Sequence, residues 1–406
     1  MKMALLYVWT ICISLSAAYN VVGDFGVILF ILIFAVVLNR FTVNRKTACA
    51  VLAFGMFIAI KAVGIKGTQS ISDYHSVYNM LSENAKRTSL FLLLPIMKKV
   101  SSENRRKADR AFLLFYHISV VLSIFVLNSV GRNTYRLSLS RDYILLAPQF
   151  YIMISVIMSM SLVYKIIKGR EHRFMYVLLL LINITYIYMA NYTTQMVFLI
   201  LGCACSLIFC SDIRKRNSFI NLSMLLVAVA LAFPYLADIV IMIKDGFFAD
   251  NPVVSVRLDE IALFLRRGNL MGTDLLVRVD RISLSLDTFK SNILTGVPFS
   301  MYNTTTTGVV VGGHSEWPDD LARYGLLGGI LFAAFMYFGI MGAIPLKDKR
   351  IQDFRKPLIL VLFLYGFANP FFRSGELLIL YLIVDELILW KSTEDMDQLP
   401  EMRNVQ

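Results

Sequence analysis

A histidine and several carboxylates come together near the end of a long polar segment, in the stretch from Gly312 to Gly328. His314 is one of only four histidines in the 406 residues, and Glu316 and Asp319 follow it closely. The charge of histidine changes nearer to neutral pH than that of any other ordinary side chain, which suits it to proton transfer. This stretch is therefore the strongest candidate for carrying the chemistry of the protein.

Less specific explanations fit the same residues. A single histidine near the end of an apolar segment is more often a hydrogen-bonded interfacial residue than a catalytic one. Glu316, Asp319 and Asp320 are also typical of the start of a helix, where acids interact favourably with the helix dipole. Gly325, Gly328 and Gly329, which follow them, are typical of close packing between membrane helices.

The composition defines the class of protein in which this stretch must be positioned. Apolar residues make up 57% of the chain, and the mean hydropathy is +0.65. Apolar runs of about 20 residues recur, the length needed to cross a bilayer core of ~30 Å. The sequence therefore predicts an all-α, polytopic integral membrane protein with about twelve transmembrane helices.

The predicted spans alternate with short connections, except for one large late loop. They cover residues 4–22, 25–39, 47–65, 77–97, 111–130, 144–164, 174–190, 195–210, 219–243, 325–346, 357–371 and 374–390. Nine spans thus occupy residues 1–243, an extracytoplasmic loop 244–324, three more spans 325–390, and a tail 391–406. Lys61 lies near the end of the third span, which favours a side chain that reaches toward the membrane surface.

The net charge of +12 is an orientation signal. Its basic residues cluster in alternate short connections, for example at Arg105, Arg106 and Lys107, and such clusters mark the cytoplasmic side of a membrane. With twelve spans, both termini are then cytoplasmic. Because the clusters are explained in this way, no nucleic-acid partner is expected.

The five cysteines all lie in apolar runs and none lies in the large loop, so they predict neither a disulfide framework nor a thiolate metal site. The first apolar run lacks a convincing cleavage site and is expected to remain as a span. The sequence also lacks a glycine-rich phosphate loop, a paired histidine metal box and a nucleophilic serine elbow.

The large loop carries two amphipathic helical patterns. One runs from Val256 to Arg267; the other begins at Thr273 or Asp274, either of which can cap it. On the second helix Arg278, Arg281 and Ser285 share a face that differs from the apolar one. We expect both helices to lie on or dip into the outer membrane surface, with the threonine run 304–307 as a hinge or lid.

The order of residues from Arg281 to Gly328 resembles that of the bacterial O-antigen polymerase and ligase superfamily. The matching features are a basic residue, Asn292-Ile293-Leu294-Thr295-Gly296, then His314-Ser315, nine residues, Gly325, two residues and Gly328. Relatives also have about twelve spans and one large late external loop. The chain departs from them in having Thr295 before Gly296, where relatives have Asn-Pro-Leu-Gly, and a serine after the histidine.

The resemblance implies glycosyl transfer from an undecaprenyl-pyrophosphate donor, without cofactor, nucleotide or metal. His314 is then the base for the acceptor hydroxyl, and Glu316 or Asp319 orients it or substitutes for it. Five arginines become candidates for binding the pyrophosphate, since guanidinium forks match phosphate oxygens: Arg278 and Arg281 in the large loop, and Arg136, Arg141 and Arg373 at other external helix ends.

Each of these arginines has an alternative role. Arg278 and Arg281 would equally pair with nearby aspartates on a solvated face, and the other three would contact lipid headgroups. At the level of function, polymerisation of lipid-linked oligosaccharide repeat units is preferred, in the inner membrane of a bacterium. Two other functions stay open: an O-antigen ligase that transfers finished polymer, and a flippase or secondary carrier. The expected partners are the lipid-linked donor and acceptor and membrane lipid, with a chain-length regulator protein as a further candidate.

Overall fold

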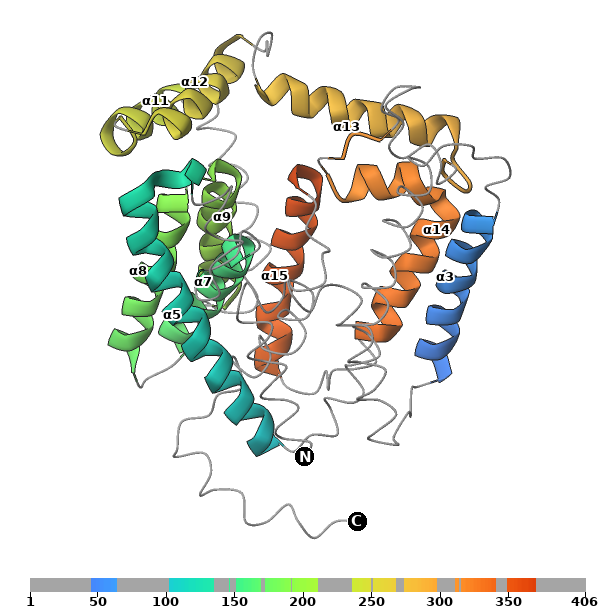
Figure 1. Ribbon diagram of the computed structural model, residues 1–406, viewed down its shortest axis with the longest axis horizontal. Coiled ribbons are helices and arrows are strands. Elements are labelled where there is room, and N and C mark those ends of the chain that lie inside the picture. The colour runs from blue at the N-terminus through green and yellow to red at the C-terminus, as the bar shows by residue number, and fades with distance from the viewer. Residues whose placement is uncertain are drawn as a thin grey trace.

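The computed structural model describes residues 45–63, 102–134, 146, 151–168, 172–190, 192–210, 236–249, 251–267, 274–297, 311–313, 315–340 and 349–369. Within these residues the chain forms helices and no strands, so the all-α class is confirmed for this part (Figure 1). The helices are α3 (Arg45–Val63), α5 (Ser102–Thr134), α7 (Tyr151–Lys168), α8 (Arg173–Ala190), α9 (Thr193–Cys210), α11 (Leu236–Phe247), α12 (Pro252–Arg267), α13 (Asp274–Ser291), α14 (Trp317–Ile340) and α15 (Lys349–Ala368).

Two of these helices contain segments long and apolar enough to cross a membrane, Leu113–Val130 in α5 and Arg173–Ala190 in α8. Two shorter apolar helical segments, Ala48–Lys61 and Thr194–Phe209, coincide with further predicted spans. The predicted spans 4–22, 25–39, 77–97 and 374–390 lie outside the described residues. The number of twelve spans therefore stays a prediction.

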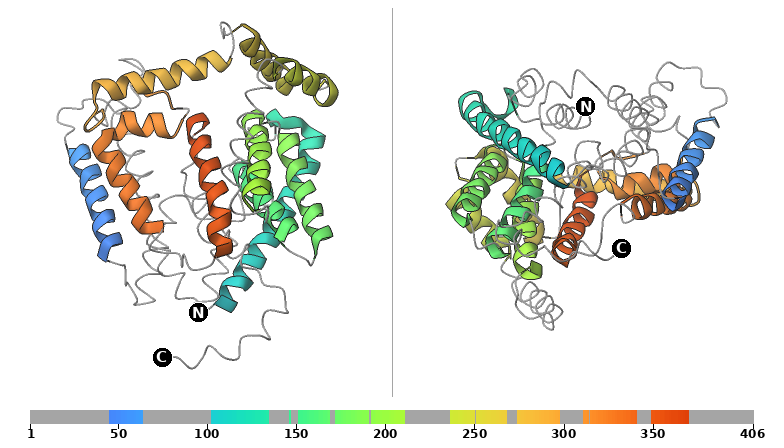
Figure 2. Two further views of the ribbon diagram at one scale, coloured as in Figure 1. Left: turned by 180° about the vertical axis from the view of Figure 1, so that it is seen from behind. Right: turned by 90° about the horizontal axis from the view of Figure 1, so that it is seen from below.

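The helices fall into two groups by direction. Helices α3, α5, α7, α8, α9 and α15 and most of α14 stand side by side, while α13 lies across one end of this array (Figure 1). The α11–α12 hairpin lies at the same end as α13, and the reverse view agrees (Figure 2). The ring of Phe248, just after α11, packs on Tyr188 near the end of α8 with centroids 5.6 Å apart.

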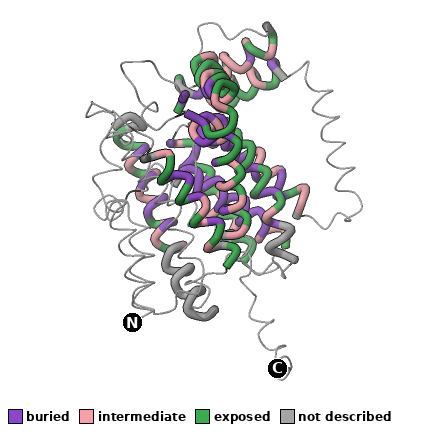
Figure 3. The backbone as a smooth tube through the Cα atoms, turned by 90° about the vertical axis from the view of Figure 1, so that its right-hand side faces the viewer, coloured by how far each residue is buried: buried purple, intermediate pink, exposed green. Residues whose placement is uncertain are grey.

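Helix α7 is the centre of the main core. Nearly all of its residues from Ile152 to Val163 are buried, and α8 and α9 pack against it. Other helices of the array keep exposed apolar faces: Phe174 of α8 is 84% exposed, and Ile60 of α3 is 68% exposed. Figure 3 shows buried and exposed residues interleaved along the upright helices, as expected when only one face of each packs inward.

A small polar cluster joins α5, α7 and α8 inside this core. Tyr116 donates a hydrogen bond to Asn183 Oδ1 at 2.6 Å and also contacts Ser155 Oγ. The Asn183 amide donates to the carbonyl of Leu179 at 2.8 Å and lies 3.4 Å from His117 Nε2. Buried polar groups that are satisfied in this way specify how apolar helices pack.

Helices form at both stretches of the large loop where the sequence predicts them, but the predicted apolar face of α13 is not its buried face: Ser285 and Thr288 are buried, whereas Val279 and Leu286 are exposed. Helix α13 begins at Asp274, and α12 ends at Arg267 as predicted but begins at Pro252, before the predicted Val256. Helix α14 differs, because it begins at Trp317 and not at the predicted span start, residue 325. Its early start is compatible with Pro318 in the first turn, where a missing backbone N–H costs no hydrogen bond.

Candidate functional site

Helix α14 is broken at Gly325, which adopts φ 64° and ψ −170°. This conformation is essentially restricted to glycine, because a Cβ atom would clash with the backbone. In an unbroken helix the N–H groups of Leu326 and Leu327 would bond to the carbonyls of Ala322 and Arg323, four residues earlier. Here they donate instead to Ile293 O at 2.8 Å and Leu294 O at 3.0 Å, just after α13.

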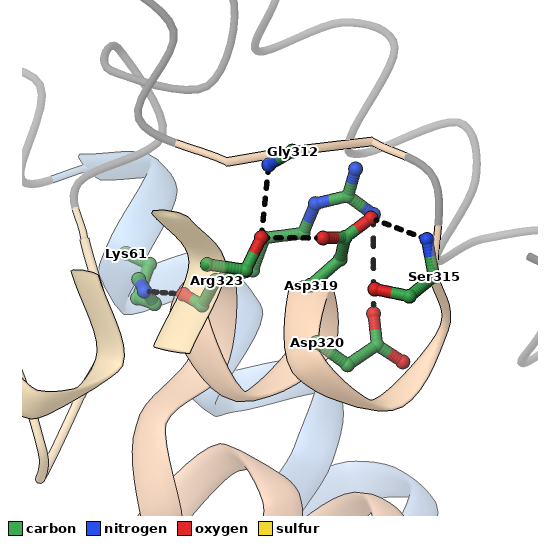
Figure 4. Close-up of polar contacts among 7 residues, drawn as sticks. Lys61, Gly312, Ser315, Asp319, Asp320 and Arg323 are labelled. Atoms are coloured by element: carbon green, nitrogen blue, oxygen red, sulfur yellow. Dashed lines mark hydrogen bonds and ion pairs between the residues drawn. The ribbon is translucent and has the colours of Figure 1, made fainter. Parts of the chain in front are cut away.

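The two carbonyls released by this break also find partners. The oxygen of Ala322 accepts a hydrogen bond from Val297 N at 3.0 Å, and that of Arg323 accepts one from Lys61 Nζ (Figure 4). Lys61, from α3, donates as well to Thr295 O at 2.6 Å. All four backbone groups released at the break are thus satisfied by other segments. We call this contact between residues 292–297 and 322–327 the α13–α14 joint.

Two glycines make the joint close enough to form. Gly296 has φ 67°, and its N–H bonds to the carbonyl of Asn292 at 2.9 Å, which ends the helical turn after α13. A Cβ atom at Gly296 would overlap the backbone carbonyl of Arg323, and one at Gly325 would overlap the backbone of Leu294 and Gly296. Both glycines are therefore required by the backbone geometry.

Helix α3 supports the joint from the side of the array. Phe54 packs on Tyr324, Phe332 and Phe335 of α14, with ring centroids 5.5–6.1 Å apart. The side chain of Phe57 occupies the position that a Cβ atom at Gly328 would need, so this glycine serves close helix packing as predicted.

A second contact joins α13 to the start of α14. The Ser285 hydroxyl donates to Asp319 Oδ1 at 2.6 Å and accepts from Gly312 N at 2.9 Å. The other carboxylate oxygen of Asp319 accepts from Ser315 N at 3.2 Å (Figure 4). Asp319 therefore holds the segment before α14 against α13. We call this group of Ser285, Gly312, Ser315 and Asp319 the serine–aspartate contact.

The acids at the start of α14 are buried. Glu316, Asp319 and Asp320 are 3%, 1% and 7% exposed. Their position at a helix N-terminus stabilises the negative charge through the dipole, and Asp320 also lies 3.9 Å from the guanidinium of Arg323. The backbone N–H of Glu316 donates to Gly366 O of α15 at 2.7 Å, which ties this end of α14 to a further helix.

Trp317 makes a second tie to α15. Its indole N–H donates to Phe363 O at 2.7 Å, and its ring lies against that of Phe363 with centroids 6.1 Å apart and planes inclined by 30°. A Cβ atom at Gly366 would overlap the indole, so the close approach depends on this glycine. The beginning of α14 is thus held by α13 on one side and by α15 on another.

The structure brings together only part of the set of predicted site residues. Arg278 is half-buried and Arg281 is exposed on α13, and the backbone of Arg281 packs directly against Gly312. Glu316 and Asp319 lie at the start of α14, near this region. The remaining predicted residues, His314, Arg136, Arg141 and Arg373, lie outside the described residues, although Gly313 and Ser315 on either side of His314 are described.

Exposed charges farther along α13 are paired locally. Lys290 lies 2.8 Å from Asp287, and this hydrogen bond holds the pKa of the Asp287 carboxyl below its usual range. In the α11–α12 hairpin, a hydrogen bond from Lys244 to Asp259 at 2.7 Å raises the pKa of the lysine in the same way. Both pairs lie within the loop helices and involve none of the predicted site residues.

Lys61, Ser285 and Arg323 belong to this site, although the sequence analysis did not include them among the site residues. Ser285 carried a signal, because it shares a helix face with the two predicted arginines. The sequence signal for Lys61 was weaker: it follows Phe54 and Phe57 at helical spacing on the face that packs against α14.

Among the described residues, no group of three or more potential ligands is arranged to hold a metal ion. No family model matches the chain, and no curated protein matches it.

Proposed function

We propose that the chain is an integral membrane glycosyltransferase that polymerises undecaprenyl-pyrophosphate-linked oligosaccharide repeat units into a surface polysaccharide. One observation carries the proposal. Helix α13, which bears Arg278 and Arg281, is held against the acidic start of α14 by the serine–aspartate contact. Two residues of this contact, Gly312 and Ser315, lie close to His314 in the sequence. Helix α13 and the described residues on either side of His314 are thus fixed to one another.

The arrangement of the helices supports a membrane location. The upright helices carry exposed apolar side chains such as Met56 of α3 and Phe363 of α15, at 63% and 51% exposure. Such exposure is far more favourable in lipid than in water. The transverse helices at one end then correspond to the extracytoplasmic surface of a bacterial inner membrane, with the cytoplasmic termini on the opposite side.

The proposed reaction makes one bond and breaks one. A hydroxyl oxygen of the acceptor repeat unit bonds to the anomeric carbon of the donor chain, and His314 takes the hydroxyl proton. The bond between that carbon and the diphosphate oxygen breaks, and undecaprenyl diphosphate leaves. Arg278 and Arg281 would stabilise the charge that develops on this leaving group.

The two predicted carboxylates take different roles in this proposal. Asp319 accepts hydrogen bonds from Ser285 and Ser315, so its role is to position the segment that contains His314. Glu316 is buried beside that segment and is the better candidate for contact with the imidazole. This assignment narrows the sequence-based hypothesis, in which either acid orients the histidine.

The test is polymerisation by the purified protein in vesicles supplied with lipid-linked repeat units. We expect a ladder of longer lipid-linked chains, and we expect His314→Ala to abolish it while the protein is still expressed and inserted. Lys290→Ala, on the exposed part of α13, is the matched control and should leave the ladder unchanged. Transfer of preformed polymer to another acceptor, without chain growth, would replace polymerisation by ligation. Movement of intact repeat units across the vesicle, without new glycosidic bonds, would replace it by transport.

A further inference from the structure

Lys61 is a charged side chain of α3 that reaches the α13–α14 joint. Its ammonium donates to Thr295 O at 2.6 Å and to the carbonyl of Arg323, and lies 5.7 Å from the centre of the Phe57 ring. Its hydrogen-bond partners lie more than two hundred residues away in the sequence. A lysine near a span end was expected to reach for the membrane surface, yet here it binds backbone oxygens within the protein.

The two carbonyls have a common electrostatic character. Thr295 lies at the end of the turns that follow α13, and Arg323 lies at the end of the first section of α14, just before the break at Gly325. Both oxygens therefore belong to helix C-termini, which carry partial negative charge. One ammonium group therefore compensates two such ends at once.

We infer that Lys61 is a positioning residue for the sugar transfer, an inference that rests on the proposed function. Arg281 lies on α13 roughly 20 Å from the joint, at 1.5 Å per residue. A tilt of α13 of about 5° at the joint would move Arg281 by roughly 2 Å, enough to misplace a group that must meet a diphosphate. Lys61 does not touch the substrate; together with the contact between Ser285 and Asp319, it fixes the helix that does.

The experiment compares Lys61→Met and Lys61→Arg with Lys290→Met, a control that removes an exposed lysine close to the joint in the sequence. We expect Lys61→Met to lower kcat for polymerisation tenfold or more, with the KM for the acceptor within twofold of its original value. Lys61→Arg should restore most of kcat, because a guanidinium can also donate to two carbonyls. Lys290→Met should change neither constant.

Amide hydrogen exchange supplies a readout that is independent of activity. Val297, Leu326 and Leu327 donate the backbone bonds of the joint, so Lys61→Met should speed their exchange at least tenfold, and exchange in α7 should be unchanged. Should Lys61→Met fail to insert, Lys61→Gln, which retains a donor, is measured in its place.

Three outcomes would overturn the inference: unchanged exchange at the joint, faster exchange with unchanged kcat, or faster exchange throughout the protein with no recovery in Lys61→Arg. A wild-type protein with slow exchange at the joint but no sugar transfer has a different meaning. That result would overturn the proposed function, and the exchange data would still decide whether Lys61 holds the joint.

Discussion

At the scale of single residues, Asp319 connects two helices, whereas its sequence context predicts only an acid at a helix start. Its side chain is 1% exposed, and its two carboxylate oxygens accept hydrogen bonds from Ser285 on α13 and from Ser315 in the segment that leads into α14. Hydrogen bonds to a charged group contribute more than those between neutral groups, and a buried donor left unpaired is costly. The acid is therefore a connection between α13 and α14 as well as part of a helix start.

Replacement of Asp319 by alanine should destabilise the protein by about 3 kcal/mol, because a charged acceptor is lost and two donors are left buried. Asp319→Asn, which keeps one acceptor oxygen, should lose about half as much. Thermal unfolding in detergent measures both effects. The control is Asp287→Ala, which removes an exposed acid paired only with solvated groups and should stay within about 0.5 kcal/mol of wild type. Equal stabilities for Asp319→Ala and Asp287→Ala would refute the role given to Asp319.

At the scale of secondary-structure elements, the main feature is that backbone groups of α14 form hydrogen bonds with the residues that follow α13 and not within their own helix. The break in α14 releases two N–H groups and two carbonyls, and residues 293–297 together with Lys61 satisfy all four. Helix α14 is therefore not a simple continuation of a loop into a span. Its first section, from Trp317 to the break, belongs with the loop helix α13 at the end of the array (Figure 1).

Two glycines of α14 provide a matched pair for testing this exchange. Gly325→Ala puts a side chain on a backbone conformation that is favourable only for glycine, and the new Cβ atom would overlap the backbone of Leu294. The variant should therefore be destabilised by at least ~2 kcal/mol. Gly329→Ala meets only a side-chain atom of Leu321 at 3.8 Å and should be neutral or stabilise by up to ~1 kcal/mol. The free energies of unfolding of the two variants in detergent check this. A well-folded Gly325→Ala protein of wild-type stability would mean that the break is not essential.

At the scale of the whole molecule, the transverse helices and the buried acids lie at one end of an array of apolar helices (Figures 1 and 2). The beginning of α3, with its basic residues Arg45 and Lys46, lies at the opposite end of that helix from Lys61. If the array spans a membrane, α13 and the start of α3 must face different compartments. This is also what the positive-inside pattern of the connections predicts.

Cysteine labelling in intact cells tests this polarity. In a cysteine-free background, Asp287→Cys on α13 should react with a membrane-impermeant maleimide once the outer envelope is opened to the reagent. Lys46→Cys, at the start of α3, should react only after the inner membrane is permeabilised. Both positions are exposed, so a lack of reaction cannot be attributed to burial. Labelling of both from the same side would contradict the proposed topology.

The sequence by itself was enough to predict features that depend on neighbouring residues. The helical class and the helix that begins at Asp274 both follow from periodicity along the chain. The same local reasoning placed Arg278, Arg281 and Ser285 on one face of a helix. These are properties of segments of fewer than about 20 residues, for which spacing along the chain determines spacing in space.

Only the tertiary structure decided which distant groups meet. The pairing of Lys61 with the carbonyl of Arg323 joins positions 262 residues apart, and no periodicity relates them. The break at Gly325 also depends on its partners, since it is tolerable only because residues 293–297 supply the lost hydrogen bonds. A glycine in an apolar run is compatible with a continuous helix. At Gly325 the helix is broken because the backbone of another segment supplies the hydrogen bonds that the helix loses.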